Sequence, residues 1–129
     1  MACAGAPAPE RPPASDETGW RAASDTGRLS GRLRPESGAV EIGHFQSWIL
    51  ELRASSGAGI TGADVAIAGG MPGHGHGLPT QPRVTEELGD GRYRIEGVKL
   101  NMVGAWVIEV FVQTPALRDR LRFDLAIDY

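Results

Sequence analysis

The sequence predicts an all-β domain, an immunoglobulin-like antiparallel sandwich of about seven strands. From Leu29 onward, apolar and polar residues alternate with the period of two that is typical of half-buried strands. Turn signals such as Gly89-Asp90-Gly91 separate these segments. Outside residues 116–122, which are compatible with a single helical turn, no segment has a clear helical period. About seven short strands in about 100 residues are typical of such a sandwich.

The first half of the domain contains three expected strands. Residues 29–34 place two leucines and a glycine on one face and arginine and serine on the other. Residues 44–54 repeat the pattern with one tryptophan and two leucines at alternate positions, and residues 65–67 carry a valine and an isoleucine two positions apart. Each segment is therefore expected to bury one face.

The second half contains four more. Residues 83–88 show a weak alternation, and residues 92–96 place tyrosine and isoleucine between charged residues. Residues 106–112 and 121–127 alternate over four apolar positions each. These apolar residues are therefore expected to form the inner faces of the sixth and seventh strands.

The N-terminal part has a different composition. Residues 1–28 contain four prolines and no Leu, Ile, Val or Phe, so they cannot bury enough apolar surface to offset the entropy of ordering. We expect residues 1–28 to be a disordered Pro/Ala-rich tether, with Trp20 as the one residue able to dock, and residues 29–129 to form the sandwich. The single cysteine, Cys3, excludes an internal disulfide, a Cys-based zinc finger and an iron–sulfur cluster.

Composition also narrows the possible functions. A formal net charge of -3 argues against nucleic acid or an anionic membrane surface as a partner. There is no nucleophile elbow, no P-loop lysine and no His-Glu-x-x-His helix. Glu86 and Glu87 are adjacent, so on a strand they face opposite sides and cannot work as an acid/base pair. We therefore expect a protein that is not an enzyme.

The candidate site begins with the run GGMPGHGHGLPTQP, residues 69–82, which gathers two of the three histidines and one of the three methionines. If consecutive strands run antiparallel, this run, the start of the second expected strand and the end of the fifth all meet at one pole. Trp106 opens the sixth expected strand at the same rim and would shield a bound ion. The residues expected to converge there as metal ligands are Met71, His74, His76 and Met102, with His44 as a further candidate.

Imidazole and thioether together are a ligand set for copper, the metal that uses methionine routinely. Zinc would favour cysteine, a third histidine or a carboxylate. The sequence leaves simpler interpretations open. The Gly/His run is also compatible with a solvated turn, Met102 with a core plug, and His44 with a hydrogen bond to a loop carbonyl.

The string MPGHGHGLPTQP followed by GDGRYRIEGVKLNMVGAW resembles the YtkA-like/FixH-like family of bacterial extracytoplasmic β-sandwich domains. This resemblance implies an envelope protein associated with copper handling or oxidase assembly. Val103 stands where the second turn of the family would have proline. The order of His and Met residues also resembles the ligand set of PCuAC-type periplasmic copper chaperones, with different spacings.

Met-Ala-Cys followed by a Pro/Ala-rich stretch resembles the mature end of a bacterial lipoprotein, which implies a lipid anchor on Cys3; a free thiol is the alternative. The expected function is that of a periplasmic or extracytoplasmic copper carrier, chaperone or store. Its expected partners are a copper ion and a copper-accepting envelope protein or oxidase assembly factor. The alternative is a metal-free interaction module that contacts a membrane protein through the same loop. The sequence leaves the copper oxidation state and the oligomeric state open.

Overall fold

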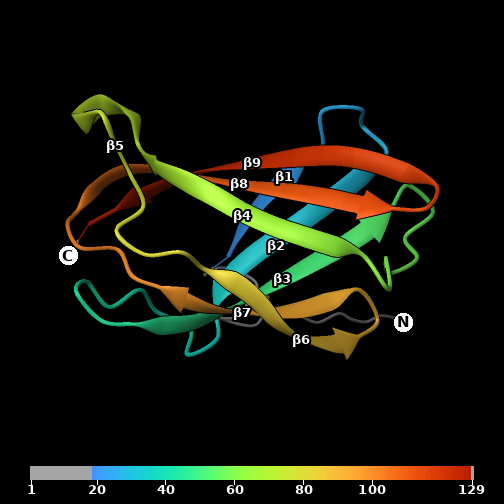
Figure 1. The fold of residues 1–129 in the computed structure, drawn as a ribbon, viewed down its shortest axis with the longest axis horizontal. Coiled ribbons are helices and arrows are strands. Elements are labelled where there is room, and N and C mark those ends of the chain that lie inside the picture. The colour runs from blue at the N-terminus through green and yellow to red at the C-terminus, as the bar shows by residue number, and fades with distance from the viewer. Residues whose placement is uncertain (1–18, 129) are drawn as a thin grey trace, which may run out of the picture.

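The computed structural model describes residues 19–128 and shows an antiparallel β-sandwich (Figure 1), which confirms the predicted fold class. All seven expected strands have a counterpart, and two short strands are added. No helix among the described residues is both long and apolar enough to cross a membrane. The elements are β1 (Trp20–Ala23), β2 (Leu29–Pro35), β3 (Gln46–Ala54), β4 (Asp64–Met71), the 3-10 turn η2 (Pro72–His74), β5 (His76–Gly77), β6 (Arg83–Gly89), β7 (Arg92–Val98), β8 (Gly104–Thr114) and β9 (Leu117–Ile127).

The strands follow the hydrogen-bonded order β1-β2-β3-β7-β6-β4-β8-β9, with β5 paired to β4. Between β6 and β4 there is a single residue pair, Ala66 with Arg83. This weak junction divides the strands into two layers, β1-β2-β3-β7-β6 and β4-β8-β9 (Figure 1). On the opposite side, the isolated bridge between Ser24 and Leu121 brings the end of β1 toward β9, so the sandwich is almost a closed barrel.

The ordered part of the chain begins before the expected boundary. β1 pairs with β2 over all four of its residues, and the Trp20 ring stacks on Trp48 with centroids 5.5 Å apart. The expectation that residues 1–28 lack structure is therefore wrong for Trp20–Ala23, because pairing with β2 and one aromatic contact stabilise a segment that has little apolar surface of its own. Residues 1–18 lie outside the described residues. Residues 116–122 form no helical turn, since β9 begins at Leu117.

The core fills the space between the two layers. The alternating residues of β3, β8 and β9 point into it, and Leu50, Val110 and Leu121 are completely buried. Burying a side chain of this size contributes about 1.5–3 kcal/mol. Tyr93 closes one end of the core, where its hydroxyl donates to the Ile60 carbonyl at 2.7 Å. Strand alternation therefore explains most of the core.

The predicted pole exists as one end of the sandwich, at the left of Figure 1. β4 and β7 end there, and β3 and β8 begin there. The strand order therefore brings three chain segments together at this end: the run before β3, the turn after β4 and the connection between β7 and β8.

Candidate metal site

The Gly/His run folds back on β4 as a short hairpin. Gly70 pairs with Gly77 and Met71 pairs with His76, while η2 and Gly75 make the turn between them. Glycine is required here: Gly75 has the left-handed φ of 68°, and a Cβ on Gly70 would lie 2.3 Å from the His76 carbonyl oxygen. The run is therefore a turn of defined shape, so the positions of its histidines are set by the backbone.

The hairpin brings its two imidazoles together, and one of them contacts Trp106. The ring centroids of His74 and His76 are 5.9 Å apart, and His76 meets Trp106 edge-on at 6.1 Å. His76 Nδ1 lies 3.0 Å from the Gly77 carbonyl oxygen. Because a carbonyl can only accept, Nδ1 donates this bond, and the lone pair of the neutral ring is on Nε2. A hydrogen bond of this kind is typical of metal-binding histidines, since it fixes the tautomer.

Trp106 connects the hairpin to Met102. The indole is buried, and its Nε1 donates to the Met102 carbonyl oxygen at 3.0 Å. This bond holds the Met102 backbone beside the ring that His76 contacts. The Met102 residue itself is 36% exposed, so its thioether is not a core plug.

Of the two methionines, it is Met71 that packs in the core. It is completely buried, and a Cβ on Gly104 would lie 2.6 Å from the Met71 methyl group. As a cross-strand pair, Met71 and His76 project from the same face of the hairpin. The thioether of Met71 is thus beneath the hairpin, and it would have to turn outward to reach an ion at the surface.

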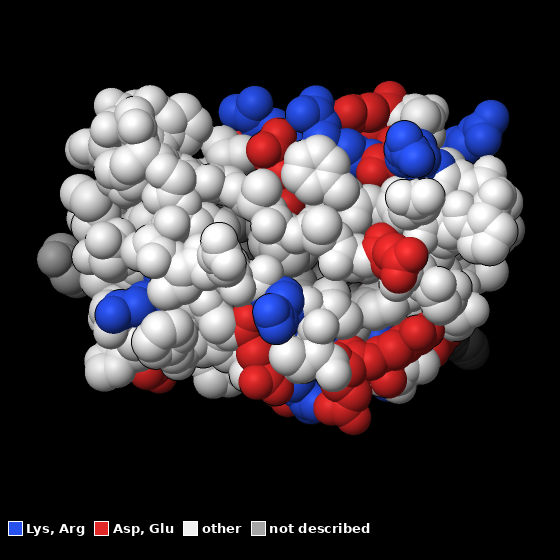
Figure 2. All heavy atoms as spheres, in the orientation of Figure 1, with Lys and Arg blue, Asp and Glu red and all other residues white. Residues whose placement is uncertain are grey.

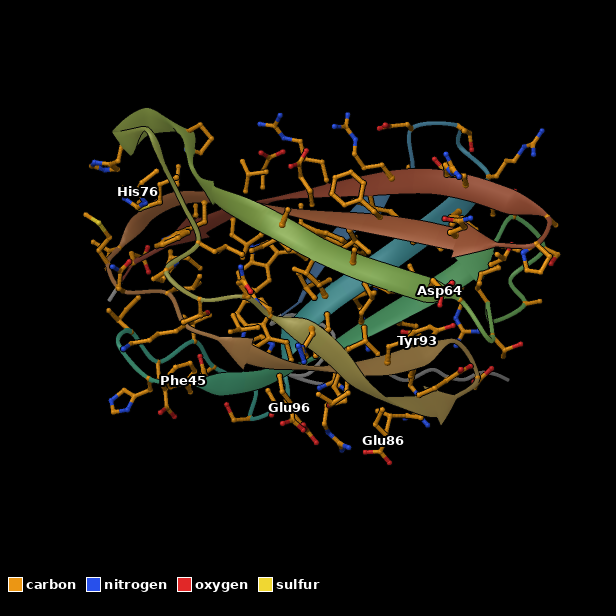
Figure 3. All side chains as sticks on the ribbon, viewed as in Figure 1. Phe45, Asp64, His76, Glu86, Tyr93 and Glu96 are labelled. Atoms are coloured by element: carbon orange, nitrogen blue, oxygen red, sulfur yellow. The ribbon has the colours of Figure 1, made fainter. Side chains whose placement is uncertain are left out.

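His44 lies at the same end of the sandwich but apart from the other four residues. It is exposed, and its backbone nitrogen donates to the Glu41 carbonyl oxygen at 3.3 Å. Figure 3 shows its neighbour Phe45 at the opposite edge of this end from His76. Within residues 19–128, no hydrogen bond or ring contact joins the His44 side chain to the hairpin.

Charged residues lie on one side of the hairpin only. Figure 2 shows mostly uncharged surface at this end of the molecule. A cavity of about 300 Å³ beside His76 is also lined by Glu109 and Arg122. In the described part of the chain, no three His, Cys, Asp or Glu side chains are grouped so that they could hold a metal. A metal site at this end would therefore need thioether sulfur beside the two imidazoles.

The spacing of the two rings is close to the spacing that a shared ion requires. A nitrogen ligand lies about 2 Å from a bound transition metal, which places the centroid of its imidazole about 3 Å away. Two rings on one ion are then at most about 6 Å apart. The His74 and His76 centroids, at 5.9 Å, lie at this limit, which corresponds to rings on nearly opposite sides of the ion. In a tetrahedral site the centroids would be about 5 Å apart, so the two rings would have to move closer together to share an ion with thioether ligands.

Comparison with protein families matches residues 28–111 to the YtkA-like family model. The chain belongs to the YtkA-like family. The matched part covers β2 to most of β8, including the hairpin, Met102 and Trp106, and leaves out β1 and β9. Neither the curated proteins nor the solved structures that were compared match this YtkA-like chain.

Sequence reasoning missed one residue that shapes this YtkA-like site. Gly104 has a φ of 137° and leaves the space that the Met71 methyl group occupies. The sequence did contain an indication, because a glycine beside a strand pattern often marks a place where another part of the chain comes close to the backbone. The partner in that approach is 33 positions away along the chain, so the fold was needed to identify it.

Proposed function

We propose that this protein binds one copper ion at the β4–β5 hairpin and carries or stores it without turnover. His74, His76 and Met102 would be the first ligands, since all three residues are exposed, His76 contacts the buried indole of Trp106, and the Met102 carbonyl oxygen accepts that indole's hydrogen bond. The observation that supports this most is the 5.9 Å separation of two imidazoles on a glycine-shaped turn, with His76 Nδ1 already hydrogen-bonded. Imidazole suits both oxidation states of copper, and thioether favours Cu(I). Trp106 would cover one side of the ion.

The other two predicted ligands have lesser roles in this proposal. Met71 would add a second thioether once its side chain turns out of the core, which costs the burial of its methyl group. His44 would join only after the connection before β3 moved toward the hairpin. We therefore expect the Met71 substitution to affect mainly Cu(I), and the His44 substitution to affect neither state strongly.

The cellular setting is also proposed, on the resemblance described above. The protein would work in the bacterial envelope, in the periplasm or on the extracytoplasmic side of a membrane. It would pass copper to an envelope acceptor or an oxidase assembly factor. A lipid on Cys3 would hold it near a membrane; Cys3 lies outside the described residues.

A second function is favoured by a separate observation. Phe45 is 67% exposed at the same end as Met102, and the Lys99 ammonium lies 5.2 Å from its ring centroid. Exposed apolar side chains on a weakly charged surface are typical of protein contact sites. The alternative is a metal-free interaction module that contacts a membrane protein through the hairpin, with Phe45 exposed at the same end of the sandwich.

Copper titration in both oxidation states separates the two functions. We expect the wild-type protein to bind one equivalent more tightly than the isolated 69–82 peptide, because the folded site adds Met102 from another segment. His74→Ala, His76→Ala and Met102→Ala should each weaken binding, and His44→Ala serves as a matched histidine control at the same end. Equal affinities for the protein and the peptide would contradict a built site and favour the interaction module.

A further inference from the structure

The outer face of β1, β2 and β3 gathers arginine side chains, although the whole chain has a net charge of -3. Arg21 of β1 lies opposite Arg32 of β2, which in turn lies opposite Glu51 of β3. The neighbouring row places Ser30 of β2 opposite Arg53 of β3. Leucines beside these residues on β2 and β3 are buried in the core, so the polar side chains project to the outer face.

A pocket of about 410 Å³ lies on this face. Its lining comes from residues 21–23, 30–32, 51 and 53. Two of its charged side chains are partly embedded in the surface, because only 17% of the Arg32 side chain and 22% of the Glu51 side chain are exposed. Three arginines and one glutamate give the lining a net charge of +2. The pocket is therefore suited to an anion.

Glu51 uses only some of the donors around this pocket. Arg53 Nε donates to Glu51 Oε2 at 2.9 Å, and Arg32 Nε lies 3.7 Å from Glu51 Oε1. Among the described residues, no hydrogen bond or ion pair engages the side chains of Arg21 and Ser30. The β1–β2 side of the pocket therefore keeps donors that a ligand could use.

Arg21 and Arg32 are like charges in direct register. Opposite residues on one face of an antiparallel pair have Cβ atoms about 4.5–5.5 Å apart, and like charges at such positions destabilise the pair. An anion between the two guanidinium groups would replace this repulsion with charge-assisted hydrogen bonds. The rim does not change the balance, because Asp90, 3.4 Å from Arg53, is offset by Arg92 in the same row on β7.

We propose that this pocket binds a small soluble phosphate monoester, with Arg21 and Arg32 on the phosphate oxygens and the Ser30 hydroxyl donating a further hydrogen bond. A phosphate monoester carries a charge of about -1.5 to -2 at pH 7, which matches the lining. A carboxylate or a phosphodiester carries one charge and would leave the pocket positive. The planar fork of arginine also suits phosphate oxygens. A phosphate on an anionic membrane fits less well, because the net charge of the molecule is repelled by such a surface.

The test is isothermal titration calorimetry of the full chain with glycerol 3-phosphate at about 0.15 M salt, where attraction between distant charges is screened. Arg21→Gln should weaken binding about tenfold, the loss typical of a hydrogen bond to a charged group. Glu51→Gln should strengthen binding, because it removes the competing carboxylate. Arg118→Gln is the matched control and should leave the affinity unchanged, since Arg118 is an exposed arginine on β9 that makes no ion pair with a described residue. Dimethyl phosphate, a diester with one charge, should bind more weakly than the monoester.

Three results would overturn the proposal. One is that glycerol 3-phosphate does not bind, or binds the wild type and Arg21→Gln equally, with thermal melts showing that both are folded. Another is that dimethyl phosphate binds as tightly as glycerol 3-phosphate, since the charge of the lining would then not select the ligand. The third is that vesicles containing phosphatidic acid bind through Arg21 while glycerol 3-phosphate does not, since a membrane phosphate would then be the ligand.

Discussion

Gly104→Ala tests whether the contact beneath the hairpin is as tight as the structure shows. An alanine Cβ would lie 2.6 Å from the Met71 methyl group, closer than real Cβ contacts allow. Overpacking costs about 1–3 kcal/mol, and the lower end of this range applies here because the methyl group is the end of a flexible side chain that can shift. The φ of 137° adds a backbone cost of about 1–3 kcal/mol for a residue with a side chain. We expect the free energy of unfolding to fall by about 2–4 kcal/mol, which lowers Tm by about 10–25 °C in a domain of this size.

A double-mutant cycle separates the two costs. Met71→Ala removes the methyl group that Gly104 faces and should itself cost about 2–5 kcal/mol. In that background, Gly104→Ala should cost about 1 kcal/mol less than in the wild type, because the clash is gone and the backbone cost remains. Urea denaturation at 25 °C measures all four proteins. Gly38→Ala is the matched control for the backbone cost, since Gly38 has a φ of 96° and no atom near its Cβ position.

Two outcomes would refute this reasoning. If Gly104→Ala is as stable as the wild type, the close approach to Met71 does not exist in solution. If Gly104→Ala costs the same with Met71 and with alanine at position 71, the loss comes from the backbone alone. Met71 would then not be packed against Gly104.

Three further predictions concern other parts of the molecule. Burial raises the pKa of Asp119, but hydrogen bonds from Thr26, Ser24 and Arg120 outweigh this effect, so the pKa is lowered overall. The contribution of Asp119 to stability is therefore fully present above about pH 4 and is lost as the pH falls through the lowered pKa. Asp119→Asn should reduce the difference between the free energies of unfolding at pH 7 and pH 3, measured by urea denaturation. An unchanged difference would contradict the role of the hydrogen bonds to Asp119. His76→Ala should weaken Cu(II) more than Cu(I), and Met102→Leu the reverse, in competition titrations; equal losses would count against these ligands. Trp20→Ala should lower the free energy of unfolding by about 1–3 kcal/mol, and no change would show that β1 does not dock.

Strand alternation predicted the fold class because the period of side chains on a strand is a local property. Leu50 and Leu52 are buried where the pattern places them, and so are the alternate residues of β9. β1 could not be predicted in the same way, because its stability comes from pairing with β2 and from the contact between Trp20 and Trp48. Both of these are tertiary interactions, which a local pattern of residues does not indicate.

The candidate site was likewise predictable only in part. Strand direction alone predicted that His76 and Met102 would lie at one end of the sandwich, and they do. Strand direction does not indicate how deeply a side chain is buried, however. Met71 is buried because the last residue of β4 still faces the core. Strand direction also does not indicate on which side of the sandwich end a residue lies. For this reason the sequence predicted His44 among residues that it does not contact.

Pairing between strands is the level at which sequence reasoning was weakest, and the single residue pair between β4 and β6 illustrates why. A strand pattern indicates which side chains face the core, but hydrogen-bonding partners depend on where the chain places its neighbours. Pro82 was the one local sign that a ladder would be interrupted, and it becomes informative only when Arg83 is known to lie opposite Ala66.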